Sequence, residues 1–556
     1  MSVLAKIMLG IAGGIIAPLY FYRLLLLYQL SAYRLKELRT AIKRKLPVYF
    51  LISPSLCVFA FAACAAIYSF AEFDGFVVTI ALPLAAGIAA AINAHLSAKV
   101  KLVFTARLKR LIAMFSVFAA IMAAGLAVLY PPIFAIVPIF PGTPAFLLAA
   151  AITSPVEKRR NARFISSAKN TLAVRSDLIK IGITGSYGKT TAKNLVTAFL
   201  SKQYSVCATP GNYNTPMGIA LTVRDELLAD DEVFVAEMGA RYAGDIRELC
   251  EIVSPSIAVM TAIGTQHLET FGSEEKLLQT KNELVNALPS DGVAVFNGDN
   301  DGCVKLYEKC VCRRLISGRD EEAVKRLYAL TGGNKAANNG DVSIKTNLPT
   351  PDEINSLSKY DAFYGDIGYA ARGMEFTLVV SGRATRMTTA LLGAHVPSMI
   401  AECALVANYL GIPLEKIKFA AEEVKPVAHR LELLYNGDDV IIDDAYNGNE
   451  AGAKSALEVL SKFSPRIRVL ITPGIVELGA IGESANERIG ELAAVSCDYA
   501  IFLGGNSGAL ARGAKSNGLN PENVTEVRDL DDAVEKLKTI KGEKAVLFEN
   551  DLPDNY

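Results

Sequence analysis

The chain contains the stretch Ile179-Lys180-Ile181-Gly182-Ile183-Thr184-Gly185-Ser186-Tyr187-Gly188-Lys189-Thr190-Thr191. Its β-branched start predicts a strand, and the apolar spacing of the residues after it predicts a helix, so the glycines lie in a strand-to-helix turn. Such a turn lets backbone N–H groups and the helix N-terminus surround phosphate oxygens. The strict Walker spacing is not met, because Gly182 is one residue too far from Gly188. We still expect nucleotide binding by the shorter motif, which comprises Gly185, Ser186, Gly188, Lys189, Thr190 and Thr191.

The composition limits the classes of function. The 57 basic and 57 acidic residues balance, which argues against a nucleic-acid partner held by bulk charge. Hydrophobic residues make up 51% of the chain, and their excess lies before residue 155. The nine cysteines form no paired framework, and no histidine follows Cys303, Cys310 and Cys312 at zinc-ligand spacing. Reduced cytosolic thiols are therefore expected.

Residues 1–155 are predicted to form an all-α transmembrane domain of about five spans. Five apolar segments have close to the roughly 20 residues that cross a bilayer, at about 3–28, 48–70, 76–97, 111–130 and 133–153. The last contains Pro138, Pro141 and Pro144, so a broken, re-entrant or interfacial segment is an alternative there. The first is followed by further spans, which favours an anchor over a cleaved signal peptide.

The charges between these segments predict the orientation. Basic residues gather at 34–45, at 99–110 and at 158–163, whereas the connection at 71–75 is short and acidic. The positive-inside rule then places the basic segments in the cytoplasm and the N-terminus outside. Five crossings deliver the phosphate turn to the cytosol, so we expect a multi-pass bacterial membrane protein with cytoplasmic catalytic domains.

From about residue 165 the chain alternates between strand-like and helix-like segments, which is typical of a mostly parallel α/β sheet. Residues 165–423 are predicted to form a nucleotide-binding central domain, in which 319–392 lacks a clear period until antiparallel strands at 375–380 and 384–391. A second α/β unit is predicted over 424–556. Its strands are expected at 440–442, 469–472, 500–503 and 545–548.

Three polar residues after the phosphate turn are candidates for ligand or metal binding. Glu237 ends a predicted strand, where open α/β sheets place ligands and where a carboxylate can hold Mg²⁺. His267 also follows a strand, and Lys281 lies on the next helix. Taken singly, each has an ordinary structural alternative: a capping glutamate, a structural histidine and a solvated lysine.

Taken together and in order, these motifs resemble the Mur ligase family of ATP-dependent amide-bond ligases in peptidoglycan synthesis. The resemblance covers about 179–556 and implies a P-loop central domain and a Rossmann-like C-terminal domain. It is carried by the motifs at 184–191, 211–214, 237–240, 267–273, 297–299, 429–432, 443–447 and 472–479.

The resemblance also implies roles for individual residues. Lys189 would hold the β- and γ-phosphates of ATP, and Thr190 and Glu237 would hold one Mg²⁺. His267 would bind a second Mg²⁺, which Lys281 would bridge as a carbamate. The remaining matches concern the nucleotide: Asn297 and Asp299 on the adenine side, and Arg430, Asp444, Tyr446 and Asn447 from the C-terminal domain, with Arg430 reaching the γ-phosphate.

The implied reaction activates a carboxylate as an acyl phosphate and joins it to the amine of an amino acid or dipeptide. No stretch resembles the family's N-terminal UDP-binding domain, and the predicted spans stand in its place. We therefore expect a membrane-bound carboxylate acceptor, such as a lipid-linked peptidoglycan precursor, and contact with membrane lipid. The alternatives are a transport ATPase, against which the absence of an ABC-type signature argues, and a non-catalytic cell-wall scaffold.

Overall fold

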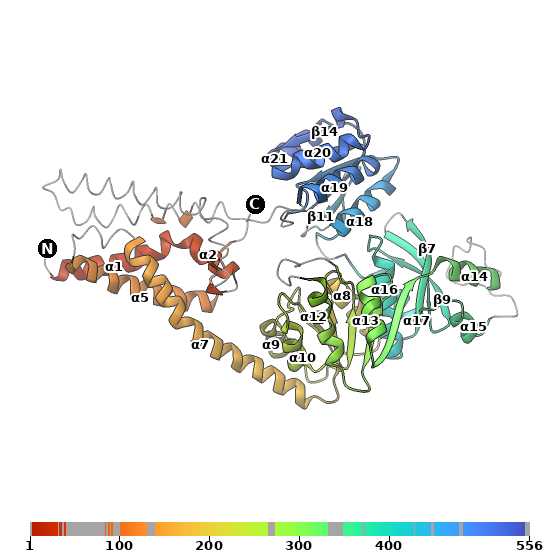
Figure 1. Ribbon diagram of the computed structural model, residues 1–556, viewed down its shortest axis with the longest axis horizontal. Coiled ribbons are helices and arrows are strands. Elements are labelled where there is room, and N and C mark those ends of the chain that lie inside the picture. The colour runs from red at the N-terminus through yellow and green to blue at the C-terminus, as the bar shows by residue number, and fades with distance from the viewer. Residues whose placement is uncertain are drawn as a thin grey trace. The chain divides into compact units, whose positions relative to one another are not determined.

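In the computed structural model the chain divides into two compact units, Met1–Arg163 and Phe164–Leu552 (Figure 1). The structure describes residues 3–31, 33–35, 38–39, 84, 87–88, 91–92, 101–129, 139–264, 273–331, 349–370, 373–426, 429–445, 450–476 and 482–550.

The described part of the first unit is mainly helical. Its helices include α1 (Val3–Tyr20), α2 (Tyr22–Leu30), α5 (Ala106–Leu129) and the start of α7 (Ile139–Val174), and residues 101–105 before α5 are not helical. Among the described residues, one stretch, Ala106–Leu126, is long and apolar enough to cross a membrane. The predicted first span is instead two helices that meet at Phe21. The predicted span at 48–70 lies outside the described residues, as does nearly all of 76–97.

The prolines of the fifth predicted segment do not break it where the structure describes it. From Ile139 the chain is a single helix of 36 residues that contains Pro144 and Pro155 and continues through the basic segment. The alternative of a break at Pro144 is therefore excluded, while Pro138 lies outside the described residues.

The second unit contains two sheets, and the larger has nine strands in the order β2-β3-β1-β4-β5-β6-β7-β8-β9. Strands β1 to β7 pair in parallel, and β7, β8 and β9 pair antiparallel. The strands are β1 (Ile179–Thr184), β2 (Val206–Ala208), β3 (Val233–Glu237), β4 (Ile257–Met260), β5 (Val293–Asn297), β6 (Arg313–Arg319), β7 (Ala362–Ala370), β8 (Gly373–Val380) and β9 (Arg383–Thr389).

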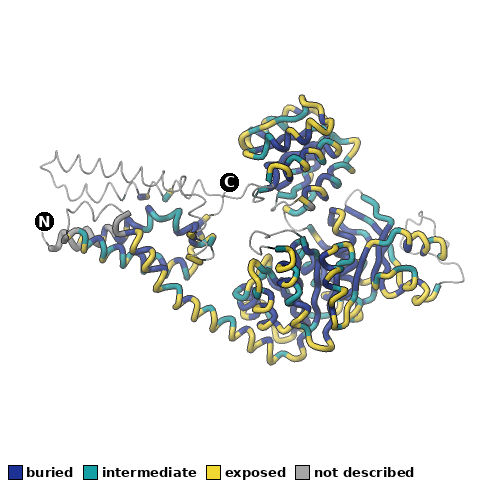
Figure 2. Tube along the Cα trace, in the orientation of Figure 1, coloured by how far each residue is buried: buried dark blue, intermediate teal, exposed yellow. Residues whose placement is uncertain are grey.

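Helices cover both faces of this sheet because the strands are apolar on both sides. On β3, Val233 and Val235 pack into one hydrophobic cluster, and Phe234 and Ala236 pack into the other. In Figure 2 the strands of this sheet are largely dark blue, the colour of buried residues. The helices of this domain are α8 (Lys189–Leu200), α9 (Pro216–Asp225), α10 (Asp245–Val253), α12 (Glu274–Asn286), α13 (Asp301–Lys309), α14 (Glu321–Thr331), α15 (Pro351–Asn355), α16 (Val396–Tyr409) and α17 (Leu414–Glu423).

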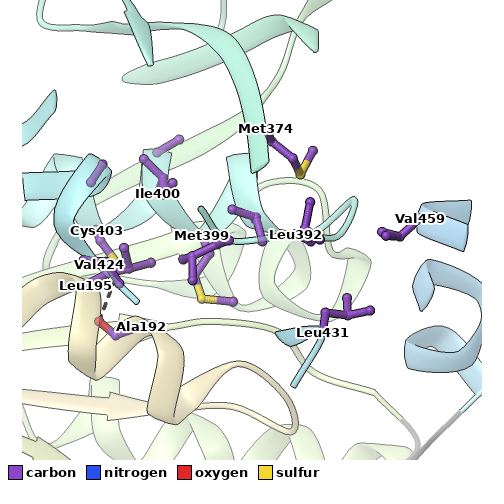
Figure 3. Packing of buried hydrophobic residues seen from close by; sticks show 14 of the residues in the cluster. Ala192, Leu195, Met374, Leu392, Met399, Ile400, Cys403, Val424, Leu431 and Val459 are labelled. Atoms are coloured by element: carbon purple, nitrogen blue, oxygen red, sulfur yellow. Dashed lines mark hydrogen bonds between the residues drawn. The ribbon is translucent and has the colours of Figure 1, made fainter. Parts of the chain in front are cut away.

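Helix α16 is the most deeply buried of these and packs against the phosphate-binding helix. All residues from Val396 to Ala407 are buried, and the thiol of Cys403 donates to the backbone oxygen of Ala192 in α8 over 3.6 Å (Figure 3). Met399 lies in the same cluster, directed toward the turn before α8. The helix that follows the antiparallel strands thereby fixes the start of α8.

The smaller sheet has six strands in the order β10-β11-β15-β12-β13-β14, with only the β10–β11 pair antiparallel. Its strands are β10 (Glu432–Asn436), β11 (Asp439–Asp444), β12 (Ile467–Thr472), β13 (Tyr499–Leu503), β14 (Val524–Val527) and β15 (Lys544–Glu549). Its helices are α18 (Glu450–Leu460), α19 (Gly482–Ser496), α20 (Ser507–Ser516) and α21 (Leu530–Thr539), with short 3-10 turns η1 (Ser461–Phe463), η3 (Gly504–Asn506) and η4 (Pro521–Asn523).

These elements confirm the predicted α/β class with a central and a C-terminal domain. The four strands predicted after residue 440 are all present as β11, β12, β13 and β15. The region predicted to lack a clear period contains helix α14 and strand β7, and β6 ends where that region begins.

Candidate active site

The phosphate turn connects β1 to α8, as the sequence predicts. Gly188 caps the helix with φ of 78°, a left-handed conformation that glycine adopts without strain. A Cβ atom at Gly185 would lie 2.1 Å from Oγ1 of Thr261, so only glycine fits there. Ser186 is buried, and its hydroxyl exchanges hydrogen bonds with the backbone of Gly264. Hydrogen bonds therefore fix the conformation of the turn, and its glycines leave the backbone N–H groups open to a phosphate.

Lys189 lies across this turn. Its Nζ donates to the backbone oxygens of Gly185 over 2.9 Å and Ser186 over 3.1 Å. Burial lowers the pKa of the Lys189 ammonium, and the positive charge of Arg430 lowers it further, while Glu237 opposes the shift. The lysine is thus held at the mouth of the turn by carbonyl groups that a phosphate can replace as hydrogen-bond acceptors.

Glu237 is the centre of a buried polar network at the end of β3. Its carboxylate accepts from Thr190 Oγ1 over 2.9 Å and from Asn214 Nδ2 over 3.1 Å. The Nζ of Lys193 lies 3.6 Å from the same carboxylate and also donates to the backbone oxygen of Gly211. The structure therefore joins the predicted Thr190 and Glu237 directly.

Sequence reasoning missed Lys193. Its side chain is 3% exposed, and burial lowers the pKa of its ammonium, although Glu237 acts in the opposite direction. Lys193 follows Lys189 by four residues, so both lie on one face of α8. A second lysine on the face that continues from a phosphate turn was the signal that could have identified it.

Lys281 is buried in α12, contrary to the ordinary expectation of a solvated lysine. It is 3% exposed, and burial lowers the pKa of its amine to about 7, assisted by the charge of Lys189 and opposed by Asp245. His267 lies outside the described residues. Within the described part of the chain, no three His, Cys, Asp or Glu side chains gather to hold a metal ion.

The predicted adenine-side residues are engaged by the protein itself. Asn297 donates to the backbone oxygen of Thr261 over 2.7 Å and accepts from Ser398 Oγ over 2.8 Å. The Asp299 carboxylate accepts from the Arg319 backbone N–H at 2.8 Å and from the Tyr364 hydroxyl at 2.6 Å. These contacts fix the loop after β5.

In the C-terminal domain, Arg430 lies between two residues of positive φ, His429 at 62° and Leu431 at 48°. Its charge contributes, after burial, to holding the pKa of His395 down at about 4, so that histidine is neutral. Burial raises the pKa of Asp444 to about 6, and its carboxylate accepts from the Leu431 N–H over 3.2 Å. Tyr446 and Asn447 lie outside the described residues.

Comparison with known proteins assigns both domains. Residues 183–357 match the Mur ligase middle domain, and residues 429–549 match the domain described as Mur ligase, glutamate ligase domain. Together these regions make up more than half of the chain, and the chain belongs to the Mur ligase family. The predicted family resemblance is thus confirmed for the central and C-terminal domains.

Within the family the chain is similar to MurF, the member that its motifs predicted. The UDP-N-acetylmuramoyl-tripeptide–D-alanyl-D-alanine ligase of Mycobacterium tuberculosis H37Rv is 31% identical over 63% of this chain and 64% of that protein. The Bacillus subtilis protein of the same name is 29% identical over 66% of this chain and 72% of that protein. The chain thus spans slightly less than two thirds of the mycobacterial relative.

Solved structures give the same fold. MurF from Acinetobacter baumannii matches with a TM-score of 0.58 and 22% identity, over 70% of this chain and 77% of that one. MurF ligase from Thermotoga maritima in complex with ADP matches with a TM-score of 0.56 and 23% identity, over 70% of this chain and 80% of that one.

Proposed function

We propose that this protein is an ATP-dependent amide ligase of the Mur type that acts in cell-envelope precursor synthesis. The observation that carries the proposal is the buried junction of Thr190 and Glu237 beside Lys189, at the end of a glycine turn in a Mur ligase central domain. In this reaction a substrate carboxylate takes the γ-phosphoryl group of ATP, and an amine then displaces phosphate from the acyl phosphate. Positioning and charge neutralisation carry such steps without a side-chain nucleophile.

The residues present fit Mg·ATP. Thr190 and Glu237 offer hydroxyl and carboxylate oxygens, the ligands that Mg²⁺ prefers, and Lys189 offers its ammonium to the phosphates. Bound Mg²⁺ would supply charge neutralisation for the transferring phosphoryl group. Lys193 holds the Glu237 carboxylate in place, and Arg430 would add a further positive charge from the C-terminal domain.

Lys281 fits the carbamate role that the resemblance suggests. Its buried amine has a pKa of about 7, so a large fraction is neutral at physiological pH. The neutral amine would add to CO₂ with loss of one proton, and the product is a carbamate anion. The anion would serve as a ligand for a second Mg²⁺, together with His267.

We further propose that residues 1–155 form a membrane domain of about five spans, with the ligase domains on the cytoplasmic face of a bacterial membrane. Helix α5 supports this proposal, because the apolar side chains of Val117, Ile121 and Val128, which follow its basic first turns, are each more than half exposed. Gly14 of α1 also allows close helix packing, since a Cβ atom there would lie 2.6 Å from the Ser116 backbone oxygen.

A membrane anchor favours an acceptor that is itself in the membrane, because it concentrates enzyme and substrate on one surface. We propose a lipid-linked precursor as the carboxylate acceptor and an amino acid or dipeptide, D-alanyl-D-alanine among the candidates, as the amine.

The test offers the purified full-length protein UDP-muramoyl-tripeptide or membrane-extracted lipid-linked precursor, each with ATP, Mg²⁺ and a panel of amines that includes D-alanyl-D-alanine. Mass spectrometry should detect an amide product, formed faster on the lipid-linked acceptor. Full efficiency on the UDP-linked acceptor with no activity on the lipid-linked one would refute the membrane-acceptor proposal. Failure to form an amide on either acceptor would refute the ligase proposal.

A further inference from the structure

The last strand of the C-terminal domain lies between the strands that carry its two motif turns. In the order β11-β15-β12, Asp444 is the register partner of Glu549, and Thr472 ends the strand on the other side. The three strands are parallel, so their carboxyl ends meet at one edge of the sheet, the edge where α/β folds bind ligands. Glu549 and Asn550 close this edge at its centre.

Glu549 connects β15 to the turn after β12. Its side chain is buried, and its Oε2 accepts from Thr472 Oγ1 over 2.7 Å. The same hydroxyl accepts from the Gly474 N–H over 3.0 Å. A chain of two buried hydrogen bonds therefore extends from the last strand into the turn at 473–476.

Position 474, at the end of this chain of hydrogen bonds, accepts only glycine. Its φ is 74°, and a Cβ atom there would lie 2.2 Å from Asn486 Oδ1. Asn486 in turn accepts from the Ile475 N–H over 2.8 Å. The turn thus has one closely fitted conformation, which depends on partners from β15 and α19.

Asn550 bridges the two motif turns by itself. Its backbone N–H donates to the Asp444 backbone oxygen over 3.0 Å, and its Nδ2 donates to the Gly474 backbone oxygen over 2.6 Å. Its φ is 59°, a left-handed conformation that asparagine tolerates better than most residues. One buried residue, through its backbone N–H on one side and its side-chain amide on the other, therefore sets the spacing between the Asp444 segment and the Gly474 turn.

We propose that Glu549 and Asn550 are positioning residues that hold the described parts of the two motifs, residues 443–445 and 472–476, in the arrangement required for amide ligation. The inference rests on the proposed ligase function, in which the 443–447 segment meets the nucleotide. Lys189, Thr190 and Glu237 of the central domain would hold the phosphates and Mg²⁺, and the 443–447 motif would add only part of the nucleotide contacts, so loss of the bridge should lower kcat much more than it raises the KM for ATP.

The test compares Asn550→Gly, which keeps the positive φ and removes the side chain, with Asn523→Ala as a matched control. Asn523 makes an equivalent bond in the same domain, from its Nδ2 to the Asp498 backbone oxygen over 2.9 Å. In the full-length protein, Asn550→Gly should lower kcat at least tenfold and change the KM for ATP less than twofold. Asn523→Ala should keep wild-type kcat. Equal kcat in both variants would overturn the proposal.

A second pair of variants separates positioning from folding. Glu549→Gln keeps an acceptor for the Thr472 hydroxyl and should retain at least half of wild-type kcat, whereas Glu549→Ala should lose at least tenfold. Equal losses in the two would contradict the proposed chain of hydrogen bonds.

Hydrogen exchange distinguishes failure of this inference from failure of the ligase proposal. Backbone exchange in 473–476 should speed up at least tenfold in Asn550→Gly and Glu549→Ala, and not in Asn523→Ala. Unchanged exchange would refute the positioning role even if the wild type ligates. A wild type that forms no amide would refute the proposed function whatever the exchange shows.

Discussion

Replacing Lys193 by methionine should strongly destabilise the nucleotide-binding domain. Its ammonium lies 3.6 Å from the Glu237 carboxylate, and the two side chains are 3% and 2% exposed. At an effective dielectric constant of about 20, that separation corresponds to about 5 kcal/mol. Removing one partner of a buried pair typically costs about 3–5 kcal/mol, because the other charge remains buried. We therefore expect a loss in that range.

Thermal unfolding of the full-length protein measures this loss, with Lys202→Met as the control. Lys202 pairs with Glu423, which is 69% exposed, so its removal should cost less than about 1 kcal/mol. At about 2 °C per kcal/mol, Lys193→Met should lower Tm by at least about 6 °C and Lys202→Met by about 2 °C or less. Saturating Mg·ADP should reduce the Lys193→Met deficit, since Mg²⁺ would neutralise Glu237. Equal Tm values for the two variants would refute the buried-pair argument.

Three further predictions follow from other buried groups. Both carboxylate oxygens of Glu402 are buried without a hydrogen-bond partner, and burial raises its pKa well above the ordinary value. The folded state then keeps a proton that the unfolded state loses above about pH 4.5, so stability should fall by about 1.4 kcal/mol per pH unit in that window. The Tm of Glu402→Gln should therefore rise relative to that of the wild type as the pH increases above about 5, and a difference that stays constant with pH would contradict this. Gly185→Ala should weaken Mg·ADP binding at least tenfold by calorimetry, because of the clash with Thr261, whereas Gly505→Ala, whose Cβ meets nothing within 4 Å, should bind like wild type. Lys281→Gln should abolish any stimulation of ligation by bicarbonate, and stimulation that persists would exclude a carbamate at this residue.

The central and C-terminal domains were predictable because their strands are short apolar runs that end in motif residues. The phosphate turn and the Thr190–Glu237 junction follow from glycine spacing and from the rule that ligands bind at strand ends. The spacing of four residues places Lys193 on the same face of α8 as Lys189, but it was not predicted because the sequence does not show that this face meets Glu237.

Other features were missed because their causes lie far away in the sequence. Strand β7 has an irregular register between Gly365 and Gly368, which disrupts the alternation that a pattern search needs. Glu549 and Asn550 carry no motif, and their importance arises only when β15 inserts between β11 and β12.

The most direct test of the central claim is whether ADP formation requires both the carboxylate acceptor and the amine. ADP release by the full-length protein is measured with acceptor alone, with amine alone, with both and with neither, in parallel with Lys189→Ala. A ligase should release ADP at a sustained rate only when both substrates are present, with one amide formed per ADP, and Lys189→Ala should be inactive. Sustained ADP release at the full rate with neither substrate would contradict the account and favour a transport ATPase.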